Sequence, residues 1–219
     1  MPLVSPTVDT LRAAVDRSVG GAADRSWLRL RESTGPAVDL ADAAHRRAAL
    51  VWLNAWGCRL RYPRPGEEDV FGTGLARWWA RHHPLLPAAR TPLAALPETA
   101  LPALVSAFAD LAAMPVTPGP RRRTLGPTAA SKLLYAVRPA ALPPWDDAIA
   151  RALHGCRDAD AYGAHLRLTR SWALRLLAEA GTDEVAFTTA LGHPGRTLAK
   201  MLDDYCYQVH TRGFRHQPA

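Results

Sequence analysis

Apolar residues recur along most of this chain at spacings of three and four, which is the period of an amphipathic helix. The clearest stretch runs from Thr99 to Met114 and carries its apolar face on Leu101, Leu104, Val105, Phe108, Leu111 and Ala112. No segment alternates apolar and polar residues with period two for long enough to indicate a strand. The pattern therefore predicts an all-α fold of about eight or nine helices.

The same period places the other helices and the breaks between them. Helices are predicted over residues 7–19, 38–61, 128–137, 160–180, 182–191 and 196–209, around Leu75–Trp79, and from Asp146 to about His154. The stretches 61–69, 84–97 and 115–120 are rich in proline and glycine, which indicates loops. Asp39 or Asp42 is expected to cap the helix over 38–61. We expect a single domain over 1–219, with possible lobes at about 1–115 and 116–219.

The charge balance narrows the classes of partner. The chain has 27 Lys and Arg against 20 Asp and Glu, a formal net charge of +7 and a pI near 9.9. Such a surface attracts polyanions, of which nucleic acid is the commonest, although an arginine-rich composition alone also produces it. Cys58, Cys156 and Cys206 show no metal-ligand spacing, so we expect reduced thiols, no metal and no cofactor. Without a signal peptide or an apolar run near membrane length, we expect a cytoplasmic protein with no membrane partner.

One segment combines phosphate-binding features. Gly126 permits a tight turn and Pro127 suits the first turn of a helix, whose free backbone N–H groups can hold a phosphate. Arg121, Arg122 and Arg123 add positive charge just upstream. This combination predicts a grip on the DNA backbone that does not depend on base sequence.

A candidate catalytic carboxylate follows. Pro143 and Pro144 fix the chain before Trp145, and Asp146 opens a new helix. The helix dipole and free amides favour an ionised carboxylate there. Such a group stabilises the oxocarbenium-like transition state of glycosidic cleavage or activates water. Capping alone is the competing interpretation of Asp146.

These two pieces resemble the hairpin and the catalytic-aspartate turn of the helix-hairpin-helix DNA glycosylase superfamily. The likeness is to the 8-oxoguanine-glycosylase-like fold proteins of actinobacterial type, and it covers about 30 residues closely. The matching residues are Leu125, Gly126, Pro127, Thr128 and Ala130, then Pro144, Asp146, Ile149 and Arg151, with 18 residues from Thr128 to Asp146.

The resemblance implies a two-lobed helical fold with a degenerate hairpin, in which Asp146 is catalytic and a flipped base enters a pocket. The turn Thr124–Thr128 would hold the DNA backbone. Thr128 stands where bifunctional members carry a nucleophilic lysine, which implies a monofunctional hydrolase without lyase activity. Lys132, one helical turn further on, is expected to contact a phosphate or to lie in solvent. The substrate base would belong to damaged host DNA, in repair by base excision, or to phage DNA, in anti-phage defence.

The residues expected to line the base pocket are Asn54, Trp56, Trp145, Tyr205 and Gln208. The alternative role is core packing for Trp56, a terminal helix docked on the core for Tyr205 and Gln208, and a satisfied helix position for Asn54. Two other functions stay open. One is a DNA-binding protein of this fold that has lost its chemistry, and the other is a helical protein with no nucleic-acid role.

Overall fold

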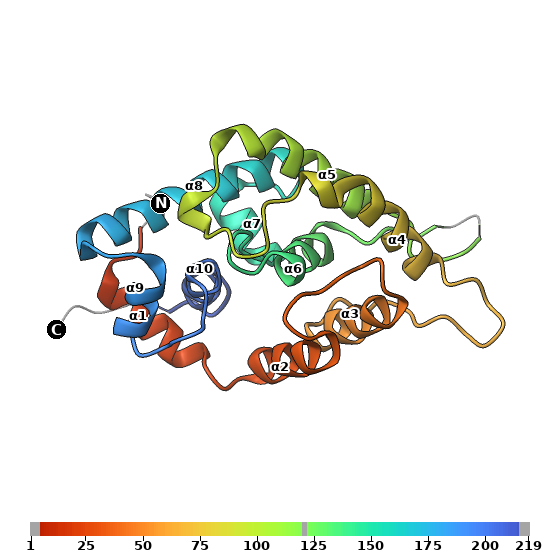
Figure 1. The fold of residues 1–219 in the computed structure, drawn as a ribbon, viewed down its shortest axis with the longest axis horizontal. Helices are drawn as coiled ribbons and strands as arrows, with labels where there is room; N and C mark the ends of the chain where they lie inside the picture. Colours follow the sequence, from red (N-terminus) through yellow and green to blue (C-terminus); the bar gives the residue numbers. More distant parts are fainter. Residues whose placement is uncertain (1–4, 120–121, 215–219) are drawn as a thin grey trace.

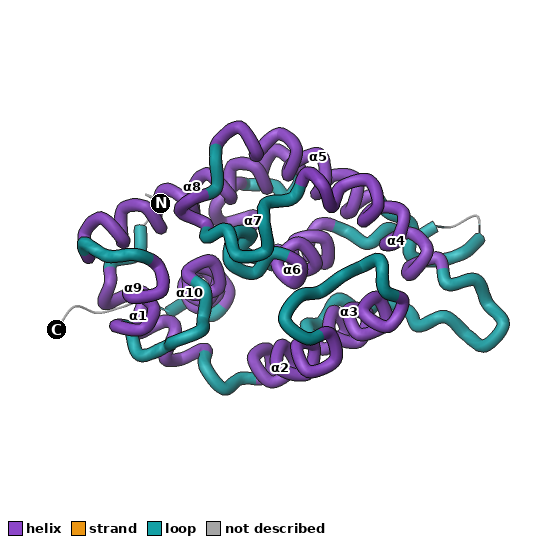
Figure 2. Tube along the Cα trace, viewed as in Figure 1, coloured by secondary structure: helices purple, strands orange, loops and turns teal. Residues whose placement is uncertain are grey.

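The computed structural model describes residues 5–119 and 122–214. Within these residues every regular element is a helix, and the one β-type pairing is an isolated bridge between Pro115 and Thr124, so the predicted all-α fold is confirmed. The α-helices are α1 (Val8–Ser18), α2 (Ala22–Thr34), α3 (Ala43–Ala55), α4 (Val70–His82), α5 (Leu101–Ala113), α6 (Pro127–Val137), α7 (Asp147–His154), α8 (Ala159–Ala180), α9 (Glu184–Ala190) and α10 (Leu198–Cys206). Short 3-10 turns lie between α4 and α5, and one π-helical turn follows α10. Figure 2 shows the described chain as helices linked by loops.

Aspartate begins several of these helices. In each case a side-chain oxygen accepts a hydrogen bond from a backbone N–H of the first turn, which satisfies a donor that has no partner inside the helix. These caps are Asp42, Asp69, Asp146, Asp158 and Asp183. For α3 the cap is Asp42, whereas Asp39 accepts from the backbone N–H of Ala41 in the preceding turn.

The predicted helix over 38–61 was too long. Val38 and Leu40 are buried although they lie in the loop before α3, so burial rather than helical structure explains their apolar character. At the other end α3 stops at Ala55, and Gly57 adopts φ +78°, which favours glycine.

The helix α2 was not predicted. Its buried residues Ser26, Leu30 and Thr34 follow a helical spacing, but two of the three are polar. Each hydroxyl donates to a carbonyl of its own helix, Ser26 to Ala23 O and Thr34 to Leu30 O. This bonding lets polar side chains occupy a buried stripe that an apolar pattern does not reveal.

The helices pack in a few close pairs around one core. Helix α2 lies against α3, α5 lies against α6 and α8, and α1 lies against α10 (Figure 1). In Figure 1, α10 is seen end-on, with α1 and α9 on one side and α6 and α7 on the other. Buried apolar side chains form a continuous cluster that includes Leu11, Trp52, Phe108, Trp145 and Leu202. The division into lobes near residues 115–116 stays a prediction.

The length and apolar character of the helices bear on whether the chain could span a membrane. None of those formed by the described residues is both long and apolar enough to cross a bilayer. Helix α8 has 22 residues, but charged residues such as Arg167, Arg170 and Arg175 interrupt its apolar sequence.

Candidate functional site

Asp146 lies partly exposed at the N-terminus of α7, where it is held from two sides. Its Oδ1 accepts a hydrogen bond of 2.8 Å from the backbone N–H of Ile149, and its Oδ2 accepts one of 2.8 Å from the Thr211 hydroxyl. Thr211 ends the π-helical turn Tyr207–Thr211, which continues α10. Such turns are frequent at functional sites. The carboxylate is therefore fixed in orientation by both α7 and the extension of α10.

The segment before Asp146 is anchored to the core. Trp145 is 1 % exposed and packs against Phe108, Tyr162 and His165, with ring centroids 5.3–5.8 Å apart. The Ser131 hydroxyl accepts from the backbone N–H of Trp145 and donates to its carbonyl, which ties α6 to this turn. Trp145, expected from the sequence to line the base pocket, is packed in the core instead, and its fixed position holds the start of α7.

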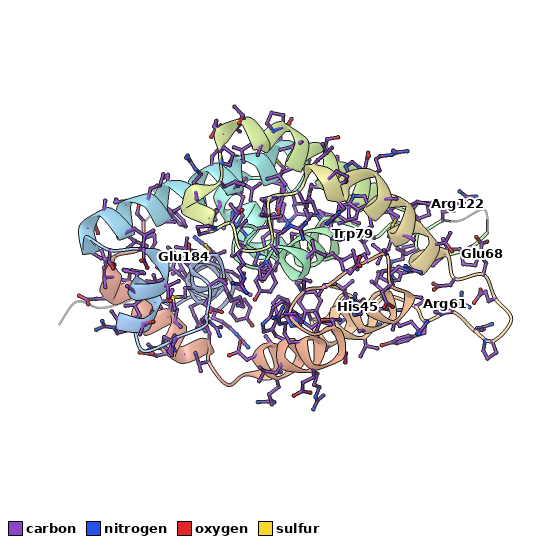
Figure 3. The ribbon with its side chains drawn as sticks, viewed as in Figure 1. His45, Arg61, Glu68, Trp79, Arg122 and Glu184 are labelled. Carbon is purple, nitrogen blue, oxygen red and sulfur yellow. The ribbon has the colours of Figure 1, made fainter. Side chains whose placement is uncertain are left out.

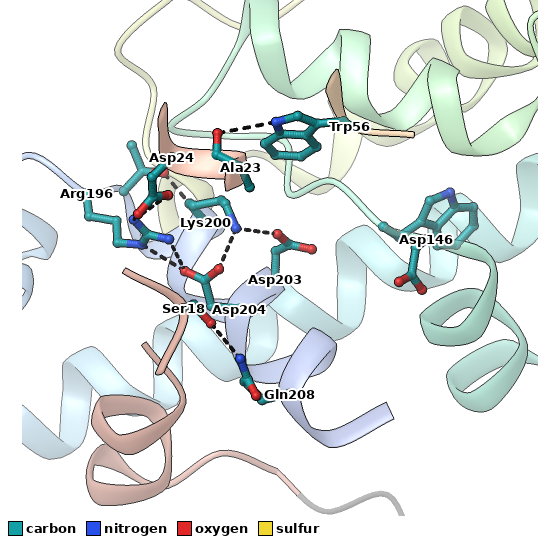
Figure 4. A network of polar contacts seen from close by, with 12 residues as sticks. Ser18, Ala23, Asp24, Trp56, Asp146, Arg196, Lys200, Asp203, Asp204 and Gln208 are labelled. Carbon is teal, nitrogen blue, oxygen red and sulfur yellow. Dashed lines mark hydrogen bonds and ion pairs between the residues drawn. The ribbon is translucent and has the colours of Figure 1, made fainter. Parts of the chain in front are cut away.

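A buried ionic network lies on α10 and the loop before it (Figure 4). Lys200 Nζ donates to Asp203 Oδ2 at 2.7 Å and to Asp204 Oδ1 at 2.5 Å. Arg196 donates to Asp204 Oδ2 at 2.8 Å and to Asp24 Oδ1 at 3.0 Å. We call Asp24, Arg196, Lys200, Asp203 and Asp204 the α10 network. It links the start of α2 to the middle of α10.

Burial and the neighbouring charges shift the pKa values of Lys200 and Asp203. Burial alone lowers the pKa of Lys200, but Asp203 and Asp204 outweigh it and raise that pKa above its ordinary value. Burial raises the pKa of Asp203, Lys200 opposes this, and the carboxylates of Asp204 and Asp146 push the pKa up again. Lys200 therefore stays an ammonium ion, and Asp203 holds its proton to a higher pH than an ordinary aspartate.

The two lysines of the chain lie near one aromatic ring. Among the 27 basic Lys and Arg residues only Lys132 and Lys200 are lysines, and their Nζ atoms lie 5.4 and 5.7 Å from the centre of the Trp56 ring. Lys132 Nζ also donates to the Trp56 carbonyl at 2.8 Å. Lys132 is buried, contrary to the alternative that placed it in solvent. Trp56 itself is half-buried, and both ammonium groups can make cation–π contacts with it.

Other pocket candidates have structural partners. The Asn54 amide donates to Leu60 O and accepts from Leu60 N, so it pins the loop after α3. Tyr205 is 2 % exposed and its ring meets Trp172 edge to face. Gln208 Nε2 donates to the Ser18 hydroxyl at 3.0 Å. The structure brings Trp56 to the α10 network, but it directs Asn54 and Tyr205 to structural contacts.

The residues expected to bind DNA are divided between two places. Arg121 lies outside the described residues, whereas Arg122 and Arg123 are exposed. Figure 3 shows Arg122 at the end of the molecule that also carries Arg61 and Glu68, away from α7 and α10. The start of α6 is nearer to Asp146, because the Trp145 indole N–H donates to Pro127 O at 3.4 Å.

Glycine has a defined role at the start of α6. Gly126 is the N-cap with φ +82° and ψ +159°, a backbone region that is essentially restricted to glycine. Its own N–H donates to Ala112 O, which ties the turn to the end of α5. Thr128 is half-buried in the first turn of α6, next to the free N–H groups there. The phosphate grip expected from the sequence would use these backbone N–H groups.

Two surface depressions lie elsewhere. One is lined by the loop Arg61–Asp69 together with Val116, and the other is an open groove of about 330 Å³ beside Arg77, Arg81 and Asp110. Neither borders Asp146 or Trp56, so neither is the base pocket expected from the sequence. Among the described residues, no group of three or more His, Cys, Asp or Glu side chains is arranged to hold a metal ion.

Sequence reasoning missed the α10 network. Two signals could have revealed it: lysine is rare in this arginine-rich chain, and Lys200 precedes Asp203 and Asp204 by three and four residues. That spacing brings the carboxylates to the same helix face as the ammonium group. The arginine and the aspartate from other segments, Arg196 and Asp24, could not be assigned to it without the fold.

The site thus consists of Asp146, the neighbouring Asp203 and Lys200, and the half-buried Trp56 ring, contributed by α3, α10 and the start of α7 (Figure 4). It offers a fixed carboxylate, a carboxyl with raised proton affinity and an aromatic face. Comparisons with protein-family models, with curated proteins and with solved structures found no match to this chain.

Proposed function

We propose that this protein is a monofunctional DNA glycosylase that hydrolyses the N-glycosidic bond of a damaged or modified base, in repair or in anti-phage defence. The observation that carries the proposal is the setting of Asp146. Its carboxylate is fixed by Ile149 N–H and the Thr211 hydroxyl, and it is partly exposed beside Asp203. A fixed anion is the group that glycosidic cleavage requires at C1′.

The chemistry follows from the charge that develops at the sugar. As the bond from C1′ to the base breaks, positive charge builds on C1′ and the ring oxygen, and a carboxylate held close to them lowers the barrier. Asp146 supplies that charge without having to reorganise, because both of its oxygens already have hydrogen-bond partners. Water then adds to C1′ and leaves an abasic site.

The charge of Lys200 and the buried position of Lys132 favour hydrolysis over strand cleavage. An imine with C1′ needs an unprotonated amine. The two carboxylates raise the pKa of Lys200, which keeps it cationic, and Lys132 is buried with its Nζ held by Trp56 O. Thr128 occupies the position at which the resemblance would place a nucleophilic lysine.

The proposal is tested by replacing Asp146 with asparagine. Oligonucleotide duplexes that carry a panel of modified bases are incubated with protein, and alkali then cuts the strand at abasic sites. We expect Asp146→Asn to lower single-turnover base release about 10²-fold or more. Asparagine is itself a good N-cap, so the free energy of unfolding should change by only a few tenths of a kcal/mol.

Asp183→Asn is the matched control. Asp183 caps α9 through a hydrogen bond of 2.9 Å from Ala186 N–H, so the variant makes the same chemical change at a different helix. Its base release should equal that of the wild type. Equal activity in Asp146→Asn and Asp183→Asn would remove Asp146 from the mechanism.

A DNA-binding protein without chemistry is the second candidate. The observation that favours it is that both Asp146 oxygens are engaged within the protein, and its Oδ1 caps α7 just as the Oδ1 atoms of Asp158 and Asp183 cap α8 and α9. This candidate predicts salt-dependent binding to duplex DNA. It also predicts that wild-type protein releases no base from any member of the panel, an outcome that would refute the glycosylase.

A further inference from the structure

The α10 network holds unequal numbers of acidic and basic groups. It contains the carboxyl groups of Asp24, Asp203 and Asp204 but only two cations, Lys200 and Arg196. With every group charged, the network carries one excess negative charge. An excess charge in a buried setting is unfavourable unless a proton or a cationic partner balances it.

The contacts within the network indicate that the excess negative charge lies at Asp203. Asp204 contacts both cations, through Arg196 at 2.8 Å and Lys200 at 2.5 Å, and Asp24 pairs with Arg196 at the far end. Asp203 has Lys200 as its cationic neighbour, bound through Oδ2 at 2.7 Å. Asp24 also has one cationic neighbour, but it accepts a further hydrogen bond from Gly20 N–H and its side chain is more exposed than that of Asp203, 19 % against 11 %, so Asp203 is the least compensated of the three acids.

Asp203 is also the member of the network that faces the Asp146 side. In Figure 4 its carboxyl group lies between the Lys200 ammonium and Asp146. The two carboxylates interact electrostatically, although they belong to different elements. The titratable or charged groups around Asp203 are Lys200, Asp204 and Cys206 on α10, Tyr135 on α6, and Asp146 before α7.

We propose that Asp203 is the proton donor to the departing base, acting together with Asp146, while Lys200 positions its carboxyl group. The inference rests on the proposed glycosylase function and adds a second catalytic residue to it. A base that is neutral in DNA leaves as a poor, anionic leaving group unless it receives a proton as the bond breaks. Because Asp203 supplies this proton, the substrate class that fits the site is neutral modified bases.

The step balances as follows. The O–H bond of Asp203 breaks and its proton goes to a ring nitrogen of the base, while the bond from C1′ to the base breaks and its electron pair leaves with the base. A water oxygen then forms the new bond to C1′. The proton that this water loses returns to the Asp203 carboxylate, so the products are the free base and a hydroxyl at C1′ of the abasic sugar.

The test compares two kinds of leaving group in wild-type protein and Asp203→Asn. One duplex carries 8-oxoguanine or hypoxanthine, which are neutral, and the other carries 7-methylguanine, which is already cationic and needs no proton. We expect Asp203→Asn to lower single-turnover release of the neutral base about 10²-fold or more and release of 7-methylguanine less than about 3-fold. Wild-type release of the neutral base should fall as the pH rises above about 6, and the variant should lose this dependence.

Asp24→Asn is the matched control. It removes a carboxylate from the same network but at the end away from Asp146 (Figure 4). We expect it to lower the melting temperature and, because it removes one negative charge from the network, to move the fall in neutral-base release to a lower pH without abolishing it, whereas Asp203→Asn should abolish it. Thermal melts of both variants establish that they are folded before rates are compared.

The outcomes separate the two proposals. Wild-type release of bases with an equal effect of Asp203→Asn on both leaving groups, or with no effect, overturns the role of Asp203 and leaves the glycosylase intact. If wild-type protein releases neutral bases alone, an unchanged pH profile in Asp203→Asn overturns the inference, and if it releases 7-methylguanine alone, both the substrate class and the proton donor are overturned. Release of no base at all refutes the glycosylase and Asp203 with it.

Discussion

At the scale of single residues, Lys200 is a buried charge that holds two carboxylates in place, and such a charge is weak evidence for stability of the fold. Removing an ammonium ion from water is expensive, and its two carboxylates recover that free energy only because they lie at 2.5 and 2.7 Å. Replacing a buried ionic network as a whole by hydrophobic residues is often neutral or stabilising, whereas replacing Lys200 alone would leave Asp203 and Asp204 buried without their ammonium partner. The structure keeps a lysine there, in a chain whose other basic residues, Lys132 apart, are all arginines. A compact ammonium with three donors can hold two carboxylates of one helix at once, which favours a role in positioning them.

His165 carries a pH-dependent prediction. It is 1 % exposed in the core behind Trp145, and burial, together with the nearby His154 and His210, lowers its pKa from 6.5 to about 3. Between these values the unfolded chain binds a proton that the folded chain does not, so folding stability is complete above pH 6.5 and falls as the pH drops toward 3. We expect His165→Leu to flatten this loss, which amounts to at most about 1.4 kcal/mol per pH unit. Urea denaturation at a series of pH values measures it.

Tyr162→Phe is the control for that experiment. Tyr162 packs against the same Trp145 ring, and burial raises the pKa of its hydroxyl, so it does not titrate in acid. Asp203 contributes the opposite dependence, because its raised pKa favours the folded state at low pH, but it is present in every protein compared. A His165→Leu curve parallel to that of the wild type from pH 6.5 to 4 would show that His165 does not resist protonation.

At the scale of elements, the turn into α6 depends on one glycine. Gly126 has φ +82° and ψ +159°, where a Cβ atom is strained although no neighbouring atom would obstruct it. We expect Gly126→Ala to lower the free energy of unfolding by about 1–3 kcal/mol. Gly155, with φ +75° and ψ −22°, ends α7 in the left-handed region that asparagine also adopts, so Gly155→Asn should cost less than about 1 kcal/mol. Urea denaturation compares the two, and equal losses would contradict the backbone argument.

The helices themselves were largely predictable, for a physical reason. Where one face is apolar, as in α5, burial follows the helical period and the boundaries agree within a few residues. Prediction failed at α2, because hydroxyls that bond their own helix occupy its buried stripe, and before α3, because Val38 and Leu40 are buried in a loop. Periodicity records burial, and it indicates a helix only where burial and helical structure coincide.

At the scale of the molecule, the candidate site could be predicted in part. The cap position of Asp146 follows from the local sequence Pro143-Pro-Trp-Asp146 before an apolar helix, and the structure has it as the N-cap of α7. The partners of that carboxylate could not be predicted, since Thr211 lies 65 positions away and Asp203 lies on another helix. Contacts between distant segments depend on the packing of α10 against α1 and α8 and of its π-helical extension against α7, which no local pattern encodes.

DNA binding by the loop before α6 is the expectation that involves the whole molecule. Arg122 and Arg123 are exposed, and the contact of the Arg123 guanidinium with Arg59 O, at 3.4 Å, is long for a hydrogen bond. Both are therefore free to meet phosphates. We expect the double variant Arg122→Ala/Arg123→Ala to weaken binding to unmodified duplexes of different sequence by a similar factor, because phosphate contacts do not read bases.

The salt dependence of DNA binding distinguishes the loss of these two phosphate contacts from a general loss of positive charge. Each phosphate contact removed should reduce the slope of log K against log salt concentration by about 0.9, so the double variant should lose about 1.8. Arg167→Ala is the control, because Arg167 lies on α8 and is paired with Glu98 at 2.6 Å. Removing it should leave the slope unchanged. If the double variant and Arg167→Ala lower affinity equally and keep the wild-type slope, the loop does not contact phosphates and the DNA-binding face lies elsewhere, whatever the chemistry at Asp146.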